Sequence, residues 1–193
     1  MAEPIAVRQS PLAHFEPVSG RDLCIAEMPF LTQVNLRVNP EGRAAAEIGL
    51  ALGVPLPTEP GTYASADADV LWLGPDEWLV VGEADEAGTA DELEARLRFA
   101  AGTEHIGITD VSAQRTALLV SGPRARDLLA HGCALDLHPG VFGPGRCAQT
   151  MLARAQVLLV AHEGDEFTVF VRSSFAGYLA AWLLDAAAEY LVE

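Results

Sequence analysis

The chain has 193 residues, and its 27 acidic residues outnumber its 12 basic ones, which gives a formal net charge of −15. This charge repels nucleic-acid phosphates and anionic membrane surfaces, so neither is expected as a partner. Half of the residues are hydrophobic, as in globular proteins, which excludes disorder as the general state.

Targeting features and cysteine usage predict a cytosolic protein. Purely apolar runs such as residues 157–161 and 178–184 are far short of the roughly 20 residues of a membrane-spanning helix. Residues 1–15 lack the basic and apolar segments of a secretory signal. Cys24, Cys133 and Cys147 form no CxxC pair and leave one thiol over in any disulfide scheme, as is usual in a reducing compartment.

The first part of the chain predicts an extended arm and then a strand. Residues 1–30 contain four prolines, which discourage helix, so we expect an arm with one short strand that packs on its own sheet rather than on a neighbouring chain. In residues 32–38, apolar Val34 and Leu36 alternate with polar Gln33 and Asn35, the period of a half-buried strand.

Two helices and a hairpin follow. Asn39 as N-cap, Pro40 at the first helical position and Gly53 as stop predict the first helix. The apolar runs 70–73 and 78–81 surround a Gly-Pro-Asp-Glu turn and predict a hairpin. A capping box of Thr89 and Glu92 opens a second helix that ends at Gly102, and a strand follows over residues 106–111.

The second half of the chain repeats this theme. A strand is expected over 116–120, a helix from Ser121-Gly122-Pro123 to Gly132, an irregular stretch over 133–146, and strands over 148–153, 156–161 and 166–171. Residues 175–191 predict a final helix that is too apolar for a simple surface helix. One face of this helix carries Phe175, Leu179, Trp182, Ala186 and Tyr190, and further apolar residues lie away from it.

This order of elements predicts an α+β fold with two related lobes of antiparallel sheet and helices. We assign residues 1–30 to the arm, 31–112 to the first lobe and 113–193 to the second. No Gly/Ser linker separates the lobes, so they are expected to form one compact unit.

Catalytic and metal motifs are weak in this sequence. His131, Cys133, His138 and Cys147 match no common zinc spacing, so we expect no metal site. Residues 143–148 match G-x-G-x-x-A, but no strand precedes them and no helix follows, so a dinucleotide site is not expected either. The polar residues of interest are arginines, which can bind carboxylates through two hydrogen bonds. They are Arg115, Arg124, Arg126, Arg146 and Arg172.

Several segments together resemble the gamma subunit family of heterotetrameric sarcosine oxidase. The hairpin sequence Leu73-Gly74-Pro75-Asp76-Glu77-Trp78-Leu79 and the stretch from Gly132 to Thr150 carry the resemblance most clearly. Further matching segments are Ser10-Pro11-Leu12, Asp110-Val111-Ser112 with Arg115, Ser121 to Ala125, and Arg172 to Leu179. The resemblance covers nearly the whole chain in the right order.

This resemblance implies the fold of the folate-binding domain of glycine-cleavage aminomethyltransferases, and it implies alpha, beta and delta subunits as partners. In such complexes sarcosine is oxidised to glycine, with hydrogen peroxide and formaldehyde or methylenetetrahydrofolate as further products. FAD, FMN, NAD and tetrahydrofolate are expected on the partner subunits and no cofactor on this chain. Residues 153–159 stand where the aminomethyltransferases carry a catalytic acidic pair, and they contain no carboxylate.

We therefore expect a non-catalytic subunit that contributes assembly and stability, without catalytic, cofactor or metal residues of its own. A stand-alone folate-binding protein of the aminomethyltransferase type is the alternative, and a self-associating structural protein is a third hypothesis. The expected interface includes the segment 133–150 and the final helix. The residues that we expect at this interface are Arg115, His138, Arg146, Arg172 and Trp182.

Overall fold

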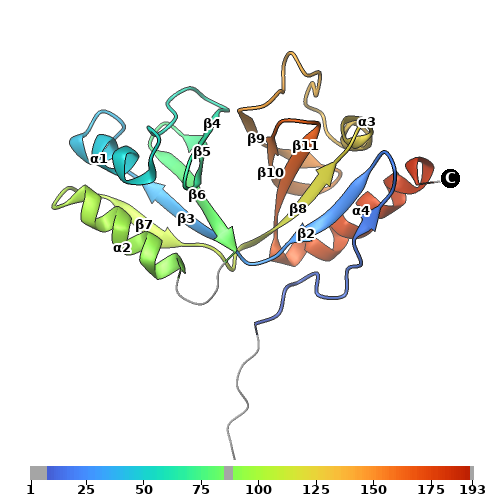
Figure 1. Ribbon diagram of the computed structural model, residues 1–193, viewed down its shortest axis with the longest axis horizontal. Coiled ribbons are helices and arrows are strands. Elements are labelled where there is room, and N and C mark those ends of the chain that lie inside the picture. Colours follow the sequence, from blue (N-terminus) through green and yellow to red (C-terminus); the bar gives the residue numbers. More distant parts are fainter. Residues whose placement is uncertain (1–7, 85–88, 192–193) are drawn as a thin grey trace, which may run out of the picture.

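The computed structural model describes residues 8–84 and 89–191 and contains two antiparallel sheets (Figure 1). The five-stranded sheet has the order β4-β5-β6-β3-β7, and the six-stranded sheet has the order β1-β2-β8-β11-β10-β9. Figure 1 shows the first sheet with α1 and α2 on the left and the second with α3 and α4 on the right. The α+β class with two antiparallel sheets is thus confirmed.

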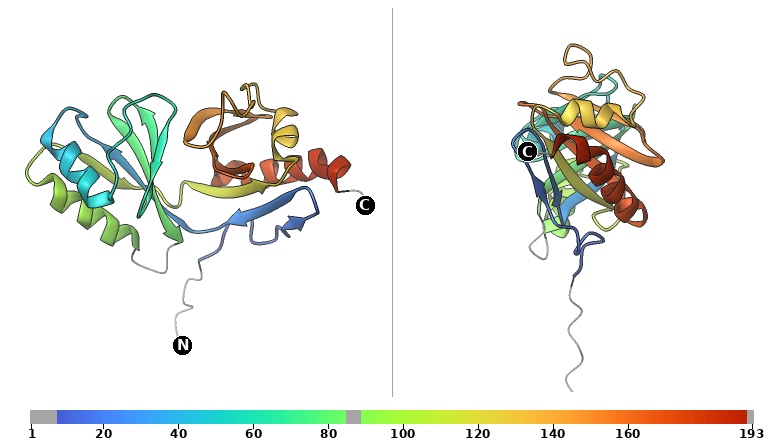
Figure 2. Two further views of the ribbon diagram at one scale, coloured as in Figure 1. Left: turned by 45° about the horizontal axis from the view of Figure 1, so that its top comes forward. Right: turned by 90° about the vertical axis from the view of Figure 1, so that its right-hand side faces the viewer.

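The five-stranded sheet is formed by the middle of the chain, and its outer face is covered by two helices (Figure 2). The core between helices and sheet includes Leu36, Ile48, Trp78 and Leu97. The strands are β3 (Leu31–Arg37), β4 (Tyr63–Ser65), β5 (Asp69–Gly74), β6 (Glu77–Ala84) and β7 (Gly107–Asp110), and the helices are α1 (Arg43–Leu52) and α2 (Thr89–Ala101).

The six-stranded sheet combines the two ends of the chain, because the predicted arm contributes β1 and β2 beside β8. Its strands are β1 (Val18–Ser19), β2 (Cys24–Met28), β8 (Arg115–Ser121), β9 (Arg146–Leu152), β10 (Ala155–Ala161) and β11 (Glu166–Arg172). Helices α3 (Ala125–Ala130) and α4 (Ala176–Ala187) share one core with the outer face of this sheet. The strands of the arm therefore pair within their own molecule, whereas the arm boundary 1–30 and the lobe boundaries 31–112 and 113–193 stay a prediction.

Both faces of the central strands are buried, which explains their continuous apolar runs. In β10, Val157 and Leu159 face the core with the helices, whereas Leu158 and Val160 face the other sheet. In β6, Val80 faces its helices and Leu79 faces the second sheet. The order of layers is therefore helix, sheet, sheet, helix.

The burial of the inner faces corrects one expectation for the first strand. Gln33 was placed on a solvent-facing side of a half-buried strand, but it is only 1% exposed. Its alternation with Val34 is real, yet the second sheet covers the face that a single sheet would leave in water. The alternating pattern does not distinguish a polar face in solvent from a polar position between two sheets.

The first helix begins later than predicted. Its N-cap is Gly42, not Asn39, and no side chain caps it. Asn39 instead closes a turn, in which its side-chain oxygen accepts a hydrogen bond from the backbone N–H of Glu41 at 3.2 Å. Gly53 ends the helix as predicted, with a left-handed φ of 75°.

The final helix is shorter than predicted, and most of the residues that it buries are alanines. Helix α4 covers Ala176–Ala187, with short 3₁₀ turns at Ser173–Phe175 and Ala188–Tyr190. Its fully buried residues are Ala176, Leu179, Ala180, Leu183 and Ala187. Phe175 is 44% exposed, whereas Trp182, Ala186 and Tyr190 pack against the core while remaining partly exposed. The small side chains of α4 let the helix approach the sheet closely. Among the described residues, no helix is long and apolar enough to cross a membrane.

Candidate functional site: an arginine pocket between the sheets

The two sheets are joined through their backbones at one edge. The Tyr63 N–H donates to the Gly145 carbonyl at 3.0 Å, and the Cys147 N–H donates to the Gly61 carbonyl at 2.9 Å. Thr62 and Arg146 form an antiparallel bridge between these bonds. This junction holds β9 beside the strands β4 and β5, so the space between the sheets has defined walls.

A pocket of about 450 Å³ opens between the sheets and holds two arginines. Arg115 on β8 stands directly opposite Arg172 on β11 in the antiparallel register. The pocket is lined by Leu73, Arg115, Gln149, Thr150, Met151, Gln156, Val157, Leu158 and Arg172. Its volume is in the range of small-ligand sites, and its lining combines two cations with amide and hydroxyl groups.

The two guanidinium groups of this arginine pocket are not neutralised within the part of the chain that the structure describes, where neither has a hydrogen-bond or ion-pair partner. Arg115 is half-buried and Arg172 is exposed. Loss of hydration lowers the pKa of Arg115, and the positive charge of Arg172 lowers it further, while Glu77 acts in the opposite direction. The site therefore favours an anion.

Buried Gln33 holds the backbone at Arg115. Its side-chain N–H donates to the Arg115 carbonyl at 3.0 Å, and its own backbone N–H donates to the Ser112 hydroxyl at 2.9 Å. The Gln33 side-chain oxygen is buried without a hydrogen-bond partner. Sequence reasoning missed this residue, because its polarity suggested a solvent-facing position.

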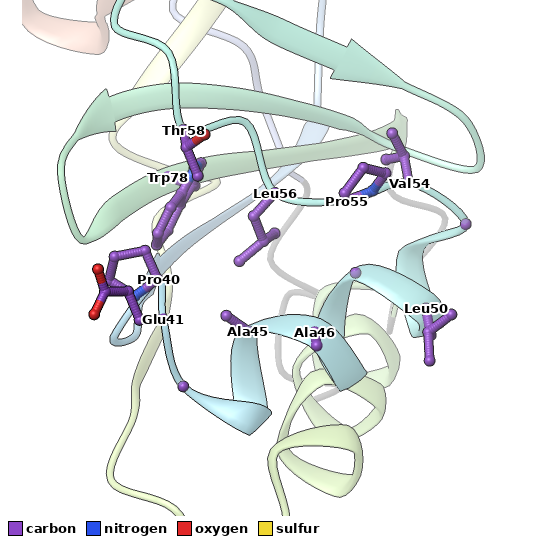
Figure 3. Close-up of a pocket in the computed structure, with 13 residues that line it drawn as sticks. Pro40, Glu41, Ala45, Ala46, Leu50, Val54, Pro55, Leu56, Thr58 and Trp78 are labelled. Atoms are coloured by element: carbon purple, nitrogen blue, oxygen red, sulfur yellow. The ribbon is translucent and has the colours of Figure 1, made fainter.

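A second, larger hollow of about 620 Å³ lies beside α1 (Figure 3). Its walls are mostly apolar and include Ala45, Leu56 and Trp78, while Glu41 and Thr58 supply polar groups. In Figure 3, Leu56 extends from its loop towards α1 and Trp78 lies across the hollow from the helix. The Trp78 indole N–H donates to the Pro57 carbonyl at 2.8 Å, which fixes the ring in place. This hollow offers apolar contact and little chemistry.

The structure brings together only Arg115 and Arg172 of the five expected interface residues. Arg146 is ion-paired with Glu59 at 2.9 Å. The His138 ring nitrogen Nδ1 accepts a hydrogen bond from the Gly140 N–H at 3.1 Å within a turn. The Trp182 ring packs so closely on Gly132 that a Cβ there would lie 2.6 Å from it. These three residues thus have contacts inside the chain and lie outside the arginine pocket.

His131, Cys133, His138 and Cys147 do not form a metal site in the structure. Nε2 of His131 lies 2.8 Å from the Tyr190 hydroxyl, whereas Cys147 is buried between the sheets. Within residues 8–84 and 89–191, no group of three or more His, Cys, Asp or Glu side chains is placed to hold a metal ion. The structure describes all three cysteines, and each is a free thiol.

Comparison with known proteins identifies the family. Residues 39–189 match the model of the sarcosine oxidase, gamma subunit family. Sarcosine oxidase subunit gamma of Corynebacterium sp. (strain U-96) is 35% identical over 98% of this chain and 95% of its own length. The protein of the same name from Arthrobacter sp. is 36% identical, with the same coverage.

Solved structures agree with this result. A chain of the heterotetrameric sarcosine oxidase from Corynebacterium sp. U-96, in complex with pyrrole 2-carboxylate, superposes with a TM-score of 0.87 at 35% identity, over 96% of this chain and 97% of that one. Aminomethyltransferase T of the glycine cleavage system from Bartonella henselae superposes with a TM-score of 0.62 at 17% identity, over 89% of this chain and 47% of that one. The second match confirms the aminomethyltransferase-like fold, and the first, together with the named relatives, shows that the chain belongs to the sarcosine oxidase gamma subunit family.

Proposed function

We propose that this chain is the non-catalytic gamma subunit of a heterotetrameric sarcosine oxidase, in which it contributes assembly and stability. The observation that carries the proposal is the match over nearly the full length of both chains to a chain of such a complex. The shared length and fold support the same kind of assembly for this chain.

The partners in this proposal are alpha, beta and delta subunits. Those chains would supply the FAD, FMN, NAD and tetrahydrofolate sites for the oxidation of sarcosine to glycine, with hydrogen peroxide and formaldehyde or methylenetetrahydrofolate as further products. We place the complex in the cytosol, and the three free thiols support a reducing compartment.

The chemistry of the pockets supports a non-catalytic role. Aminomethyltransferase T resembles this chain in fold, but at 17% identity its activity cannot be assigned to this chain. The hairpin of β9 and β10 contributes Gln149, Thr150 and Gln156 to the arginine pocket, and no acidic residue lines that pocket. General acid–base chemistry needs a titrating group at the reacting atoms.

Co-expression tests the proposal. An affinity tag on this chain, expressed together with alpha, beta and delta chains encoded beside it, is expected to recover one yellow, flavin-containing complex that oxidises sarcosine. Recovery of the tagged chain without any of these subunits would refute the proposal.

A different measurement distinguishes the proposed oxidase subunit from the alternative, a stand-alone folate-binding protein. Isothermal titration of the isolated chain with tetrahydrofolate is expected to give no saturable heat. Saturable binding to the isolated chain would favour the alternative.

A further inference from the structure

We propose that Arg115 and Arg172 bind the carboxylate of an aspartate or glutamate side chain from a partner subunit. The inference rests on the proposed function and adds to it the chemistry of one contact. Its evidence is the arginine pocket described above, in which two cations face each other and none of the described residues that line the cavity is acidic.

The position of the two arginines is unfavourable in the isolated chain. Like charges directly opposite each other on neighbouring strands destabilise a sheet, and Arg115 and Arg172 are such a pair. Arg115 is also partly removed from water, and no described residue bonds to its guanidinium in return. A carboxylate between the two side chains would remove the repulsion and supply acceptors for the guanidinium donors, which are half-buried at Arg115 and exposed at Arg172.

The chain has many carboxylates, but none of those in the described residues is paired with these two groups. Six other arginines form ion pairs with acidic residues of the chain, namely Arg37, Arg43, Arg98, Arg124, Arg126 and Arg146. Glu77 influences Arg115 only through its charge, and its Oε1 accepts a hydrogen bond from Asn35 at 2.8 Å. Residues 8–84 and 89–191 therefore do not supply the missing anion, and we assign it to a partner subunit.

A carboxylate on a partner protein fits better than a free anion. The net charge of −15 lowers the local concentration of small anions at the surface. A partner side chain avoids this cost, because the rest of the interface delivers it. The pocket is also continuous with a surface suited to such an interface, since β9 is an edge strand and its Met151 is 43% exposed in the pocket wall.

The test compares two double variants in the full co-expressed complex. Arg115→Gln with Arg172→Gln removes both charges of the pocket, and Arg37→Gln with Arg124→Gln removes two charges from exposed ion pairs with Asp76 and Asp127. The pocket variant is expected to bind the other subunits at least ~10-fold more weakly, and the control variant is expected to bind as the wild type does. Equal affinity of the pocket variant and the wild type would overturn the inference.

The melting temperature of the full isolated chain separates binding from folding. The pocket variant is expected to melt at the same or a higher temperature than the wild type, because it loses no partner in the chain and is relieved of repulsion. A lower melting temperature together with weaker assembly would assign the arginines to folding and overturn the inference. Arg172→Gln alone, at an exposed position, gives the same test if the double variant does not fold.

Two further results keep the proposals distinct. In the first, propanoate raises the melting temperature of the isolated wild type but not that of the pocket variant, and the pocket variant assembles as the wild type does. This result would show a small-molecule site and overturn the inference. Failure of the wild type to assemble would refute the proposed function, whereas normal assembly of both wild type and pocket variant refutes the arginine contact alone.

Discussion

The hydroxyl of Tyr63 lies 3.0 Å from Nδ1 of His162 and joins the two sheets through side chains. Tyr63 belongs to β4 of the five-stranded sheet, and His162 follows β10 of the six-stranded sheet. The same hydroxyl donates to the Ala161 carbonyl at 3.2 Å, and Nε2 of His162 lies 2.9 Å from the Thr168 hydroxyl. Burial is the main cause that raises the pKa of Tyr63, so its hydroxyl stays protonated and able to donate.

Replacing Tyr63 by phenylalanine is expected to destabilise the protein. The change removes the hydroxyl and leaves its partners at His162 and Ala161 without their bonds, at a cost of about 1–2 kcal/mol in the free energy of unfolding. Urea denaturation followed by circular dichroism measures it. Tyr178→Phe is the control, since Tyr178 is 40% exposed. An equal effect of both substitutions would contradict the role of the link between the sheets.

Gly132 is expected to tolerate no side chain. A Cβ at this position would lie 2.6 Å from the Trp182 ring and 2.9 Å from the Ala153 nitrogen. Gly132→Ala should therefore destabilise the protein by about 1–3 kcal/mol, as overpacking does. In α4, Gly177 has open space around it, so Gly177→Ala is expected to raise the melting temperature. If Gly132→Ala leaves the free energy of unfolding unchanged, the Trp182 ring can move away and the predicted clash does not occur.

Arg126 is expected to organise the segment between α3 and β9. Its guanidinium donates to Asp165 at 2.8 Å and to the Leu137 and Phe142 carbonyls at 2.6 and 2.9 Å. Lysine cannot reproduce this planar set of donors, so Arg126→Lys should lower the free energy of unfolding by about 1–3 kcal/mol. Arg124→Lys affects an exposed ion pair and should change the free energy of unfolding by less than about 1 kcal/mol. If both substitutions lower the free energy of unfolding equally, this role for Arg126 is ruled out.

Cys147 is expected to be unreactive in the folded chain. Burial raises the pKa of its thiol to about 11, and the thiol donates to the Thr62 carbonyl at 3.2 Å. Because the thiolate is the reactive form, iodoacetamide at pH 8 should label Cys147 only after unfolding, as read by mass spectrometry. Cys24 and Cys133 are less buried and serve as the internal comparison. Rapid labelling of native Cys147 would contradict its burial between the sheets.

The raised pKa of the Cys147 thiol leads us to expect a loss of stability at alkaline pH. Its folded pKa lies above the ordinary value of 9.0, so the unfolded chain releases the proton first as the pH rises. The stabilising contribution is complete below pH 9 and is lost as the pH rises towards 11. Cys147→Ser is expected to reduce this part of the alkaline slope in urea denaturation between these pH values.

The elements of the fold could be predicted where the signal was local. The Gly-Pro-Asp-Glu turn and its apolar flanks gave the β5–β6 hairpin correctly, because turn chemistry and strand pattern agree within a few residues. The start of α1 was wrong because the Asn39 side chain can cap either a helix or a turn. The alanines that α4 buries could not be picked out from its large apolar residues, because close approach to a sheet favours small side chains.

The candidate site was beyond local prediction. Arg115 and Arg172 were both named from the sequence, but their meeting depends on the pairing of β8 with β11, which lie far apart in the chain. The covered position of Gln33 likewise depends on the second sheet. Such contacts follow from the tertiary arrangement, and neither composition nor periodicity encodes them directly.

The most direct test of the central claim is native mass spectrometry of the complex purified through this chain. The account predicts one dominant species that contains one copy each of this chain and the alpha, beta and delta subunits, together with bound flavin. A chain that appears only as a monomer or a self-associated oligomer under the same conditions would contradict its assignment as an oxidase subunit.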